Sequence, residues 1–317
     1  MKQLTPIEIC DRYVQGDTGC EFQSDAIGGF CRLPDMFKCP VYEYFFYGQL
    51  SVSQANVFMK CKKLYEYTYL DGWDVLPLMK PRAMRLGSAV HKALESILKN
   101  TGSIDLNDYF SEDEEKERGI VGIFTDRLSH MDWGSPLSEY RFVLNPIDSP
   151  EIHGVIDLLY PDHFSEVKVS ARPDYYTSPH FLQSQLATYF MTDEALRYAN
   201  MMVIRVPELK QGKNESIDGL LNRIDEDIKK RPSHYFTGYD PEKNTFGKRF
   251  YRTEFDLPEV LERYRHIMHE RRLAIKRKCF YKNESQCLIP TPCQYMSACE
   301  TGGMSDLIYY RKEVKEE

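Results

Sequence analysis

A short stretch in the middle of the chain, residues 154–170, carries side chains that can support hydrolytic chemistry. Its second half alternates Glu166 and Lys168 with valines. Successive strand side chains point to opposite faces, so both charged groups share one face. A turn at residues 161–163 folds the first half back, and a register that sets Asp157 opposite Glu166 or Lys168 puts all three charges together. A divalent cation would relieve the repulsion between the two carboxylates.

The same spacing is common by chance, and a salt-bridged hairpin with a solvated face is the simpler interpretation of the hairpin alone. The residues on either side of it favour chemistry. In a helical pattern before the hairpin, His91 and Glu95 lie four residues apart on one flank. In a helical pattern after it, Gln185 and Tyr189 lie one turn apart. Glu139 is a further acidic candidate ahead of the hairpin.

The nine cysteines form a second group with its own chemistry. They fall into two sets, with none between residues 61 and 279. The sequence shows no signal-peptide core and no apolar run near the roughly 20 residues of a membrane span, so we expect a cytoplasmic protein without membrane contact. Thiols stay reduced there, which favours metal or cluster ligation over disulfides. The cysteines are Cys10, Cys20, Cys31, Cys39, Cys61, Cys279, Cys287, Cys293 and Cys299.

These candidates need elements that position them, and hydrophobic periodicity supplies a prediction. It indicates helices over residues 51–70 (with Ser53 as N-cap), 82–99, 120–131, 178–199 and 259–279, and strands over 137–145 and 201–209 beside the hairpin. At 317 residues and 42% hydrophobic composition, the chain can bury a large core. The order of elements predicts an α/β fold with a central mixed sheet flanked by helices.

The domain organisation follows the cysteines and the periodicity. Residues 1–48 have little periodicity and are predicted to be a cysteine-containing appendage. Residues 49–300 are predicted to be the main domain, closed by Cys61 and the C-terminal cysteines, and residues 301–317 a tail.

The succession of motifs resembles the PD-(D/E)XK nuclease superfamily, with its restriction-endonuclease-like core. The residues that carry the resemblance are His91, Asp157, Glu166, Lys168, Gln185 and Tyr189. With Cys61 ahead of them and three cysteines behind, the chain looks most like the RecB-like branch that holds an iron–sulfur cluster. The CRISPR-associated exonucleases, the AddB nuclease domain and many phage-encoded exonucleases belong there. The resemblance covers about residues 50–300. It departs in the C-x5-C-x5-C spacing, where many relatives have C-x2-C-x5-C, and in the first 48 residues.

The resemblance implies a metal-dependent DNA exonuclease, bacterial or phage-encoded, that hydrolyses phosphodiester bonds from a free strand end. Mn²⁺ or Mg²⁺ would be held by His91, Asp157, Glu166 and the backbone carbonyl of Val167, with the imidazole favouring Mn²⁺. Lys168 would position the attacking water or take its proton. Gln185 and Tyr189 would contact the nucleic-acid strand or support Lys168, and Glu95 would support His91.

The resemblance also implies one [4Fe–4S] cluster on four thiolates, which would tie the two ends of the domain together. These are Cys61, Cys287, Cys293 and Cys299, and zinc in the same four thiolates is the alternative. Cys10, Cys20, Cys31 and Cys39 form a possible second site, for zinc if for any metal, and unligated thiols are an equal interpretation.

Charge and motifs leave alternatives open. The net charge of −7 gives no global sign of nucleic-acid affinity, so local basic patches must supply it. No phosphate-binding G-x-x-x-x-G-K-[ST] motif is present, so unwinding would come from a helicase or recombination partner. A flap or branch endonuclease, and a non-catalytic iron–sulfur subunit of a DNA-processing complex, are the competing hypotheses.

Overall fold

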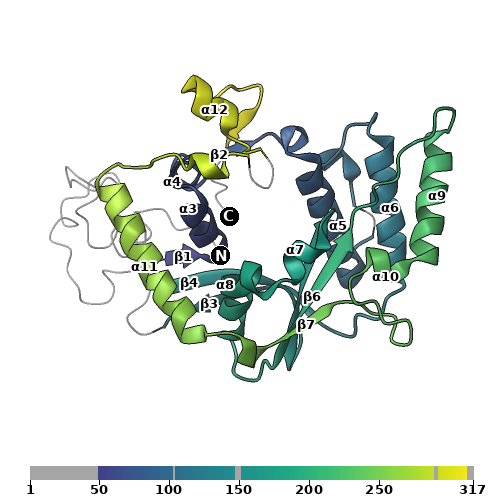
Figure 1. The fold of residues 1–317 in the computed structure, drawn as a ribbon, viewed down its shortest axis with the longest axis horizontal. Helices are drawn as coiled ribbons and strands as arrows, with labels where there is room; N and C mark the ends of the chain where they lie inside the picture. Colours follow the sequence, from purple (N-terminus) through teal and green to yellow (C-terminus); the bar gives the residue numbers. More distant parts are fainter. Residues whose placement is uncertain (1–48, 103, 147–150, 289–291, 313–317) are drawn as a thin grey trace, which may run out of the picture.

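The computed structural model describes residues 49–312, apart from 103, 147–150 and 289–291. Its centre is a mixed sheet of six strands (Figure 1), as the sequence predicts. The strands are β1 (Gln49–Ser51), β3 (Leu137–Leu144), β4 (Glu151–Leu159), β5 (His163–Ser170), β6 (Tyr198–Arg205) and β7 (Lys248–Tyr251). Strand β5 pairs antiparallel with β4 and parallel with β6.

The two edges of β4 are used differently, and this difference creates a fork in the sheet. Along one edge, β3 pairs with β4 over almost its whole length. Along the other, β1 pairs with residues 151–153 and β5 pairs only with Leu158 and Leu159. Residues 154–157 lie between these two ladders. Asp157 therefore stands where β4 and β5 diverge.

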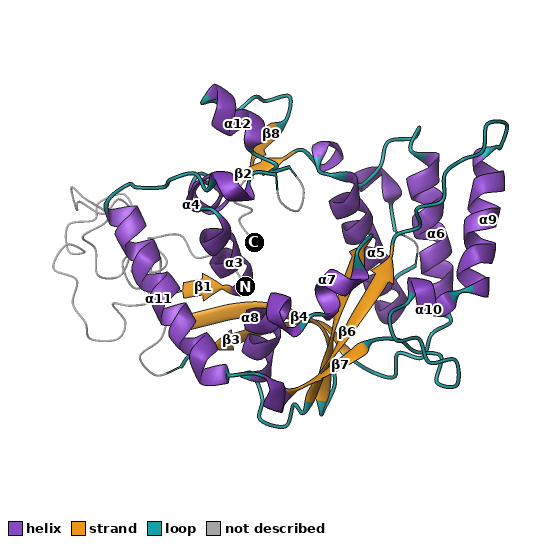
Figure 2. Cartoon of the chain, in the orientation of Figure 1, coloured by secondary structure: helices purple, strands orange, loops and turns teal. Residues whose placement is uncertain are grey.

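Two helical layers cover the sheet (Figure 2). One layer contains α3 (Val52–Lys60), α8 (Pro179–Phe190) and α11 (Leu257–Lys276), which share a core with Phe164 of β5. The other contains α5 (Arg82–Lys99), α6 (Glu115–Ser129), α9 (Ile217–Lys230) and α10 (Pro232–Tyr235), which share a core with Val167 of β5. In this layer α5 packs on β5, and α9 lies outside it on α6. The short α7 (Pro173–Thr177) follows β5 directly. The fold class is thus a mixed sheet flanked by helices.

A small module at one end of the molecule joins two distant parts of the chain. Strand β2 (Trp73–Val75) pairs with β8 (Tyr309–Arg311), and α12 (Met296–Thr301) packs beside them. The stacked rings of Tyr295 and Tyr309 lie 5.4 Å apart in its core. Strand β8 comes from the segment expected to be a tail. The remaining elements of the described residues are short helical turns: α4 (Lys62–Tyr65), η2 (Glu66–Leu70), η3 (Pro77–Met79), η4 (Leu106–Asp108), η5 (Arg252–Glu254) and η6 (Glu284–Gln286).

Local sequence explains where the helices begin and end. The predicted helix over 82–99 is confirmed, with an apolar stripe facing the sheet and Asn100 ending it at φ 52°. The predicted helix over 51–70 is broken at Cys61, whose extended backbone separates α3 from α4. Its N-cap is Ser51, which forms a capping box with Gln54, and not Ser53.

The predicted helix over 178–199 starts correctly but is too long. It ends at Phe190, and a turn follows in which the Asp193 carboxylate accepts the Ala195 N–H. Side chains of this kind compete with helical hydrogen bonds. Strand β6 therefore begins at Tyr198 and ends at Arg205, ahead of the predicted 201–209. Among the described helices, none is both long and apolar enough to span a bilayer.

Candidate active site

The hairpin has the register that brings Asp157 across from Glu166. The paired positions are Leu158 with Ser165 and Leu159 with Phe164, and the next step along this ladder is Asp157 with Glu166. Residues directly opposite each other in antiparallel strands share a face. Instead of a further ladder bond, Asp157 Oδ2 accepts the backbone N–H of Val167 at 2.8 Å.

Glu166 is the most buried acidic side chain of the site, with 1% of its surface exposed. Its Oε1 accepts hydrogen bonds from Lys168 Nζ and, at 2.8 Å, from Gln185 Nε2. Gln185 Nε2 also lies 2.9 Å from the hydroxyl of Tyr189. The second oxygen, Oε2, is buried and has no hydrogen-bond partner among the described residues. The structure thus brings Lys168, Gln185 and Tyr189 together around one carboxylate.

His91 reaches the site from the opposite helical layer. It lies on α5, and its ring hydrogen-bonds the backbone of Val167 while Nδ1 stands 3.9 Å from Asp157 Oδ2. Burial, followed by the positive charge of Lys168, lowers the pKa of His91. The ring is therefore neutral near pH 7 and has a nitrogen lone pair available for a metal ion.

The pKa values of both Asp157 and Lys168 are raised, but for different reasons. Burial, and then the charge of Glu166, raise the pKa of Asp157 well above its ordinary value. Burial alone would lower the pKa of Lys168, but the carboxylates of Glu166 and Asp157 outweigh it and the pKa is raised. Lys168 is therefore an ammonium at neutral pH, which suits it to positioning and charge neutralisation and not to accepting a proton.

The residues fit a hard divalent cation. An unpartnered buried carboxylate oxygen is costly, and a cation near Glu166 Oε2 and Asp157 would remove both that cost and the repulsion that raises the pKa of Asp157. Val167 is held beside Asp157 and His91 through its backbone. In the residues that the structure describes, however, no three His, Cys, Asp or Glu side chains already form a metal-holding group.

Two residues near the site differ from the sequence prediction: Glu95 has other partners than expected, and Tyr176 was not predicted. Glu95 does not support His91, because it forms ion pairs with Lys92 at 2.8 Å and Lys99 at 2.6 Å. Tyr176 on α7 contributes to the raised pKa of Lys168. The only sequence signal for Tyr176 is its place in a tyrosine pair just after β5.

Glu139 lies across β4 from the site. The pairs Ser138–Leu158 and Tyr140–Ile156 bracket it, so its position is opposite Asp157. Its backbone is left-handed, with φ 53°, an unusual conformation for a residue within a strand. The charge of Glu139 adds to the raised pKa of Asp157.

The four cysteines expected to hold a cluster come from opposite ends of the domain and lie near one another, but within the described residues they do not already form a metal-holding group. Cys61 Sγ accepts the backbone N–H of Asn283 at 3.4 Å, and Cys293 N–H bonds the carbonyl of Cys287 at 2.7 Å. Burial raises the pKa of the Cys293 and Cys299 thiols, and Cys61 and Cys287 add to the shift in both cases. Cys279 is exposed and is not one of these four cysteines. Cys10, Cys20, Cys31 and Cys39 lie outside the described residues.

The fold and the arrangement of the charged residues are those of one nuclease superfamily. The model of the PD-(D/E)XK nuclease superfamily matches residues 49–300, and the chain belongs to this superfamily. Its members act on DNA and use divalent metal ions. A crystal structure described as a "Putative exonuclease" from Eubacterium rectale is similar at a TM-score of 0.41 and 12% sequence identity, over 83% of this chain and 91% of that one. No curated protein matches this chain.

Proposed function

We propose that this protein is a metal-dependent DNA exonuclease that hydrolyses phosphodiester bonds from a free strand end. The observation that carries the metal dependence is the buried Glu166 Oε2. Within the described part of the chain it has no hydrogen-bond partner, whereas Oε1 accepts hydrogen bonds from Lys168 and Gln185. A buried acceptor left open beside a second carboxylate is the arrangement that a cation completes.

Each residue has a role that its surroundings allow. Glu166, Asp157, the Val167 carbonyl and His91 would hold the ion, which supplies charge stabilisation to the phosphate and lowers the pKa of water. Lys168, kept as an ammonium, would orient the attacking water and offset phosphate charge. Gln185 holds the carboxylate of Glu166 in one orientation through its own contact with Tyr189.

The experiment compares end-labelled linear DNA with closed circular DNA, each with Mg²⁺, Mn²⁺ or EDTA. An exonuclease degrades the linear DNA from its ends, leaves the circular DNA intact and is inactive in EDTA. Cleavage of the circle would favour a structure-specific endonuclease. No cleavage of either substrate with either metal would favour the non-catalytic subunit.

We further propose that Cys61, Cys287, Cys293 and Cys299 hold a [4Fe–4S] cluster, which would place the chain in the RecB-like iron–sulfur branch. The support is the convergence of thiols from both ends of the domain and the electrostatic influence of these thiols on one another. Zinc in the same thiolates is the alternative. Elemental analysis of anaerobically purified protein distinguishes about four iron atoms per chain from one zinc.

The proposed substrate is single-stranded DNA or duplex with a free end. Because the sequence has no G-x-x-x-x-G-K-[ST] motif, extended degradation of duplex would need a helicase or recombination partner. Comparison of digestion rates on single-stranded and blunt duplex DNA of equal length tests this requirement.

A further inference from the structure

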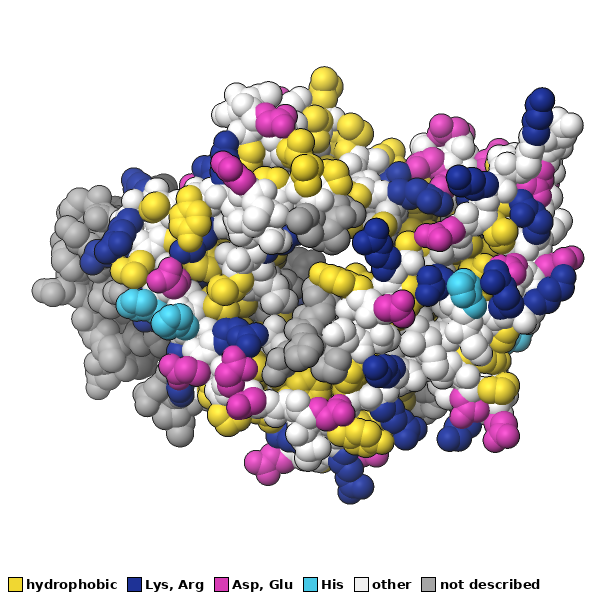
Figure 3. All heavy atoms as spheres, in the orientation of Figure 1, with side chains coloured by type: hydrophobic (Ala, Val, Ile, Leu, Met, Phe, Trp, Pro, Cys, Tyr) yellow, Lys and Arg dark blue, Asp and Glu magenta, His cyan; other side chains and the backbone are white. Residues whose placement is uncertain are grey.

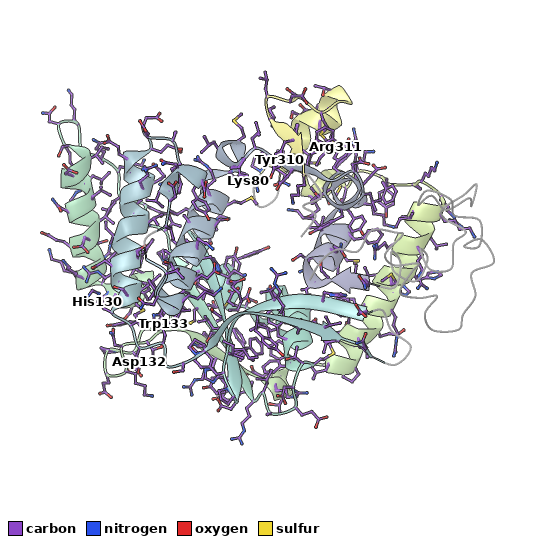
Figure 4. All side chains as sticks on the ribbon, turned by 180° about the vertical axis from the view of Figure 1, so that it is seen from behind. Lys80, His130, Asp132, Trp133, Tyr310 and Arg311 are labelled. Atoms are coloured by element: carbon purple, nitrogen blue, oxygen red, sulfur yellow. The ribbon has the colours of Figure 1, made fainter. Side chains whose placement is uncertain are left out.

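A cavity of about 530 Å³ lies on the other face of the catalytic strand. Glu166 and Lys168 face the layer of α8 and α11, whereas Ser165 points the other way and lines the cavity. The cavity opens between the loop after α6 and the segment that leads into β7. Figure 4 labels Asp132 and Trp133 on that loop, where the helices of this layer end close to the strands. Its volume is in the range of small-molecule sites.

The floor of the cavity is polar and uncharged. Ser165 is 2% exposed and lies beside Asn200 and Met202 of β6. Asn200 Nδ2 donates to the carbonyl of Phe246 at 3.1 Å, which fixes the amide. Gly247 packs so closely on this amide that a Cβ would come within 2.1 Å of Asn200 Oδ1. The floor is thus a set of positioned hydrogen-bonding groups.

The walls are aromatic and held in place. Trp133 donates its indole N–H to the carbonyl of Leu128 at 2.7 Å and meets the ring of Phe246 edge-on at 6.3 Å. On another side, His163 is stacked between Tyr160 at 4.2 Å and Tyr198 at 4.5 Å. Because these rings stack on one another, they form a fixed aromatic wall beside the hydrogen-bonding groups, and such a lining suits a heteroaromatic ligand.

A positively charged side chain, that of Arg249, lies at the rim of the cavity. The guanidinium of Arg249 lies 4.8 Å from the centre of the Tyr198 ring. Within the described residues, no carboxylate forms an ion pair with Arg249, whereas the nearby Lys243 stands 3.7 Å from Asp240. A planar guanidinium free of a carboxylate matches a phosphate group.

We propose that this cavity binds a single nucleotide, with the base between the aromatic walls and the phosphate at Arg249. The ligand chemistry is that of a nucleoside monophosphate. A nucleoside monophosphate group can come from two sources, a free nucleotide and the 5′-phosphorylated end of a DNA strand. The site does not depend on hydrolysis, so it stands or falls separately from the proposed nuclease activity.

Tryptophan fluorescence offers a direct test, because the chain has only two tryptophans, Trp73 and Trp133. In a Trp73→Phe protein the emission comes from Trp133, on the cavity wall. The four deoxynucleoside monophosphates are titrated in EDTA, which suppresses metal-assisted phosphate binding at the active site. A 5′-phosphorylated trinucleotide is titrated in parallel and distinguishes the two sources. We expect a saturable change in emission.

The matched pair of variants is Arg249→Ala and Lys248→Ala, in the same background. Lys248 has the same charge on the same strand, but it donates to the carbonyl of Thr177 and does not line the cavity. Arg249→Ala should weaken binding at least about tenfold, as loss of a charged hydrogen bond does, whereas Lys248→Ala should leave it unchanged. Deoxyadenosine and deoxyribose 5-phosphate should each bind more weakly than deoxyadenosine monophosphate.

Three results would overturn the proposal. One is the absence of a saturable signal with every nucleotide and with the trinucleotide, checked by calorimetry on the unmodified protein. Another is equal affinity in Arg249→Ala. The third is equal affinity for deoxyribose 5-phosphate and the full nucleotide, which would mean an anion site without base recognition. Loss of DNA cleavage in a separate assay would affect only the proposed function.

Discussion

The carboxylate of Asp157 bonds the backbone N–H of Val167 at the point where β4 and β5 stop pairing. A buried backbone donor must have a partner, and here a side chain takes the place of the next rung of the ladder. The catalytic candidate therefore also closes the fork in the sheet. Replacing it affects both chemistry and fold, and the choice of substitution separates the two effects.

Lys168→Ala should lower the rate of cleavage by a factor on the order of 10² to 10³, because it removes a preorganised positive charge beside the phosphate. Metal binding should persist, since Lys168 donates to Glu166 and is no metal ligand. Cleavage of end-labelled DNA and calorimetric titration of Mn²⁺ measure the two properties. Lys229→Ala, on an ion pair with Asp225 remote from the site, is the control. A Lys168→Ala protein with wild-type rates would show that the site is misassigned.

Asp157→Asn should abolish cleavage and yet stabilise the metal-free protein at pH 7. The pKa of Asp157 is raised in the folded state, so ionisation of its carboxyl group destabilises the folded protein. This cost is absent below the ordinary pKa of 3.8 and is complete once the pH has risen through the pKa of the folded state. Asparagine removes this cost and still accepts the Val167 N–H. A gain of about 1 kcal/mol is expected, measured as thermal unfolding in EDTA. The gain should shrink as the pH falls toward 4.

Asp157→Ala serves as the comparison for that variant, because alanine leaves the Val167 N–H without its acceptor. It should be less stable than Asp157→Asn by roughly 1–3 kcal/mol. An Asp157→Asn protein that melts below the wild type at pH 7 would contradict the account of the raised pKa.

His91→Ala should weaken Mn²⁺ binding more than Mg²⁺ binding, because an imidazole ligand suits manganese better than magnesium. Activity should be titrated with each ion, and the half-saturating concentrations compared. Lys92→Ala, the next residue on α5, tests for a general effect on the helix. Unchanged dependence on both ions would make His91 a structural partner of Val167 and not a ligand.

Gln185→Ala should reduce activity by about tenfold, because one side-chain amide orients Glu166 and meets Tyr189. Tyr189→Phe should have a smaller effect, since the ring still packs edge-on against Phe164 at 5.5 Å. The ratio of the two losses is the measurement. A larger loss in Tyr189→Phe would point to a direct role of the hydroxyl with the substrate.

Cys61→Ser should cost more stability than the roughly 0.5 kcal/mol of a surface substitution, because one lost ligand leaves three thiolates without a complete site. Iron content and the brown absorption of anaerobic protein should fall with it. Cys279→Ser, at an exposed cysteine outside the group, is the matched control. Any remaining cleavage should still require a divalent cation. Equal iron content in both variants would argue against ligation by Cys61.

The sequence predicts the elements whose periodicity is strong and whose ends carry local signals. The helix over 82–99 and the hairpin that carries Glu166 and Lys168 are of this kind. The end of α8 is not, because its apolar spacing continues past Phe190 and the turn at Asp193 depends on one side-chain bond. The break at Cys61 has no local signal either, since neighbouring residues favour a helix on both sides.

The site shows the same division between local and non-local information. Strand alternation suffices to place Glu166 beside Lys168, and helical spacing to place Gln185 beside Tyr189. The bond from Asp157 to Val167 depends on where a ladder ends, which no short pattern encodes. The left-handed backbone of Glu139 and the pairing of Glu95 with lysines depend on neighbours that only the folded chain supplies.

The meeting of Cys61 with Asn283 has a mechanical consequence. Close by, Lys63 donates its N–H to the carbonyl of Tyr281 at 3.2 Å, so residues more than two hundred positions apart are joined directly. If the cysteines are bridged by a metal group, tension applied at the two ends of the chain passes from Cys61 to the C-terminal cysteines. The enclosed segment, which contains β4, β5 and β6 with the proposed catalytic residues, then lies off the covalent path between the two ends and is joined to them through noncovalent contacts such as the pairing of β1 with β4 and of β8 with β2.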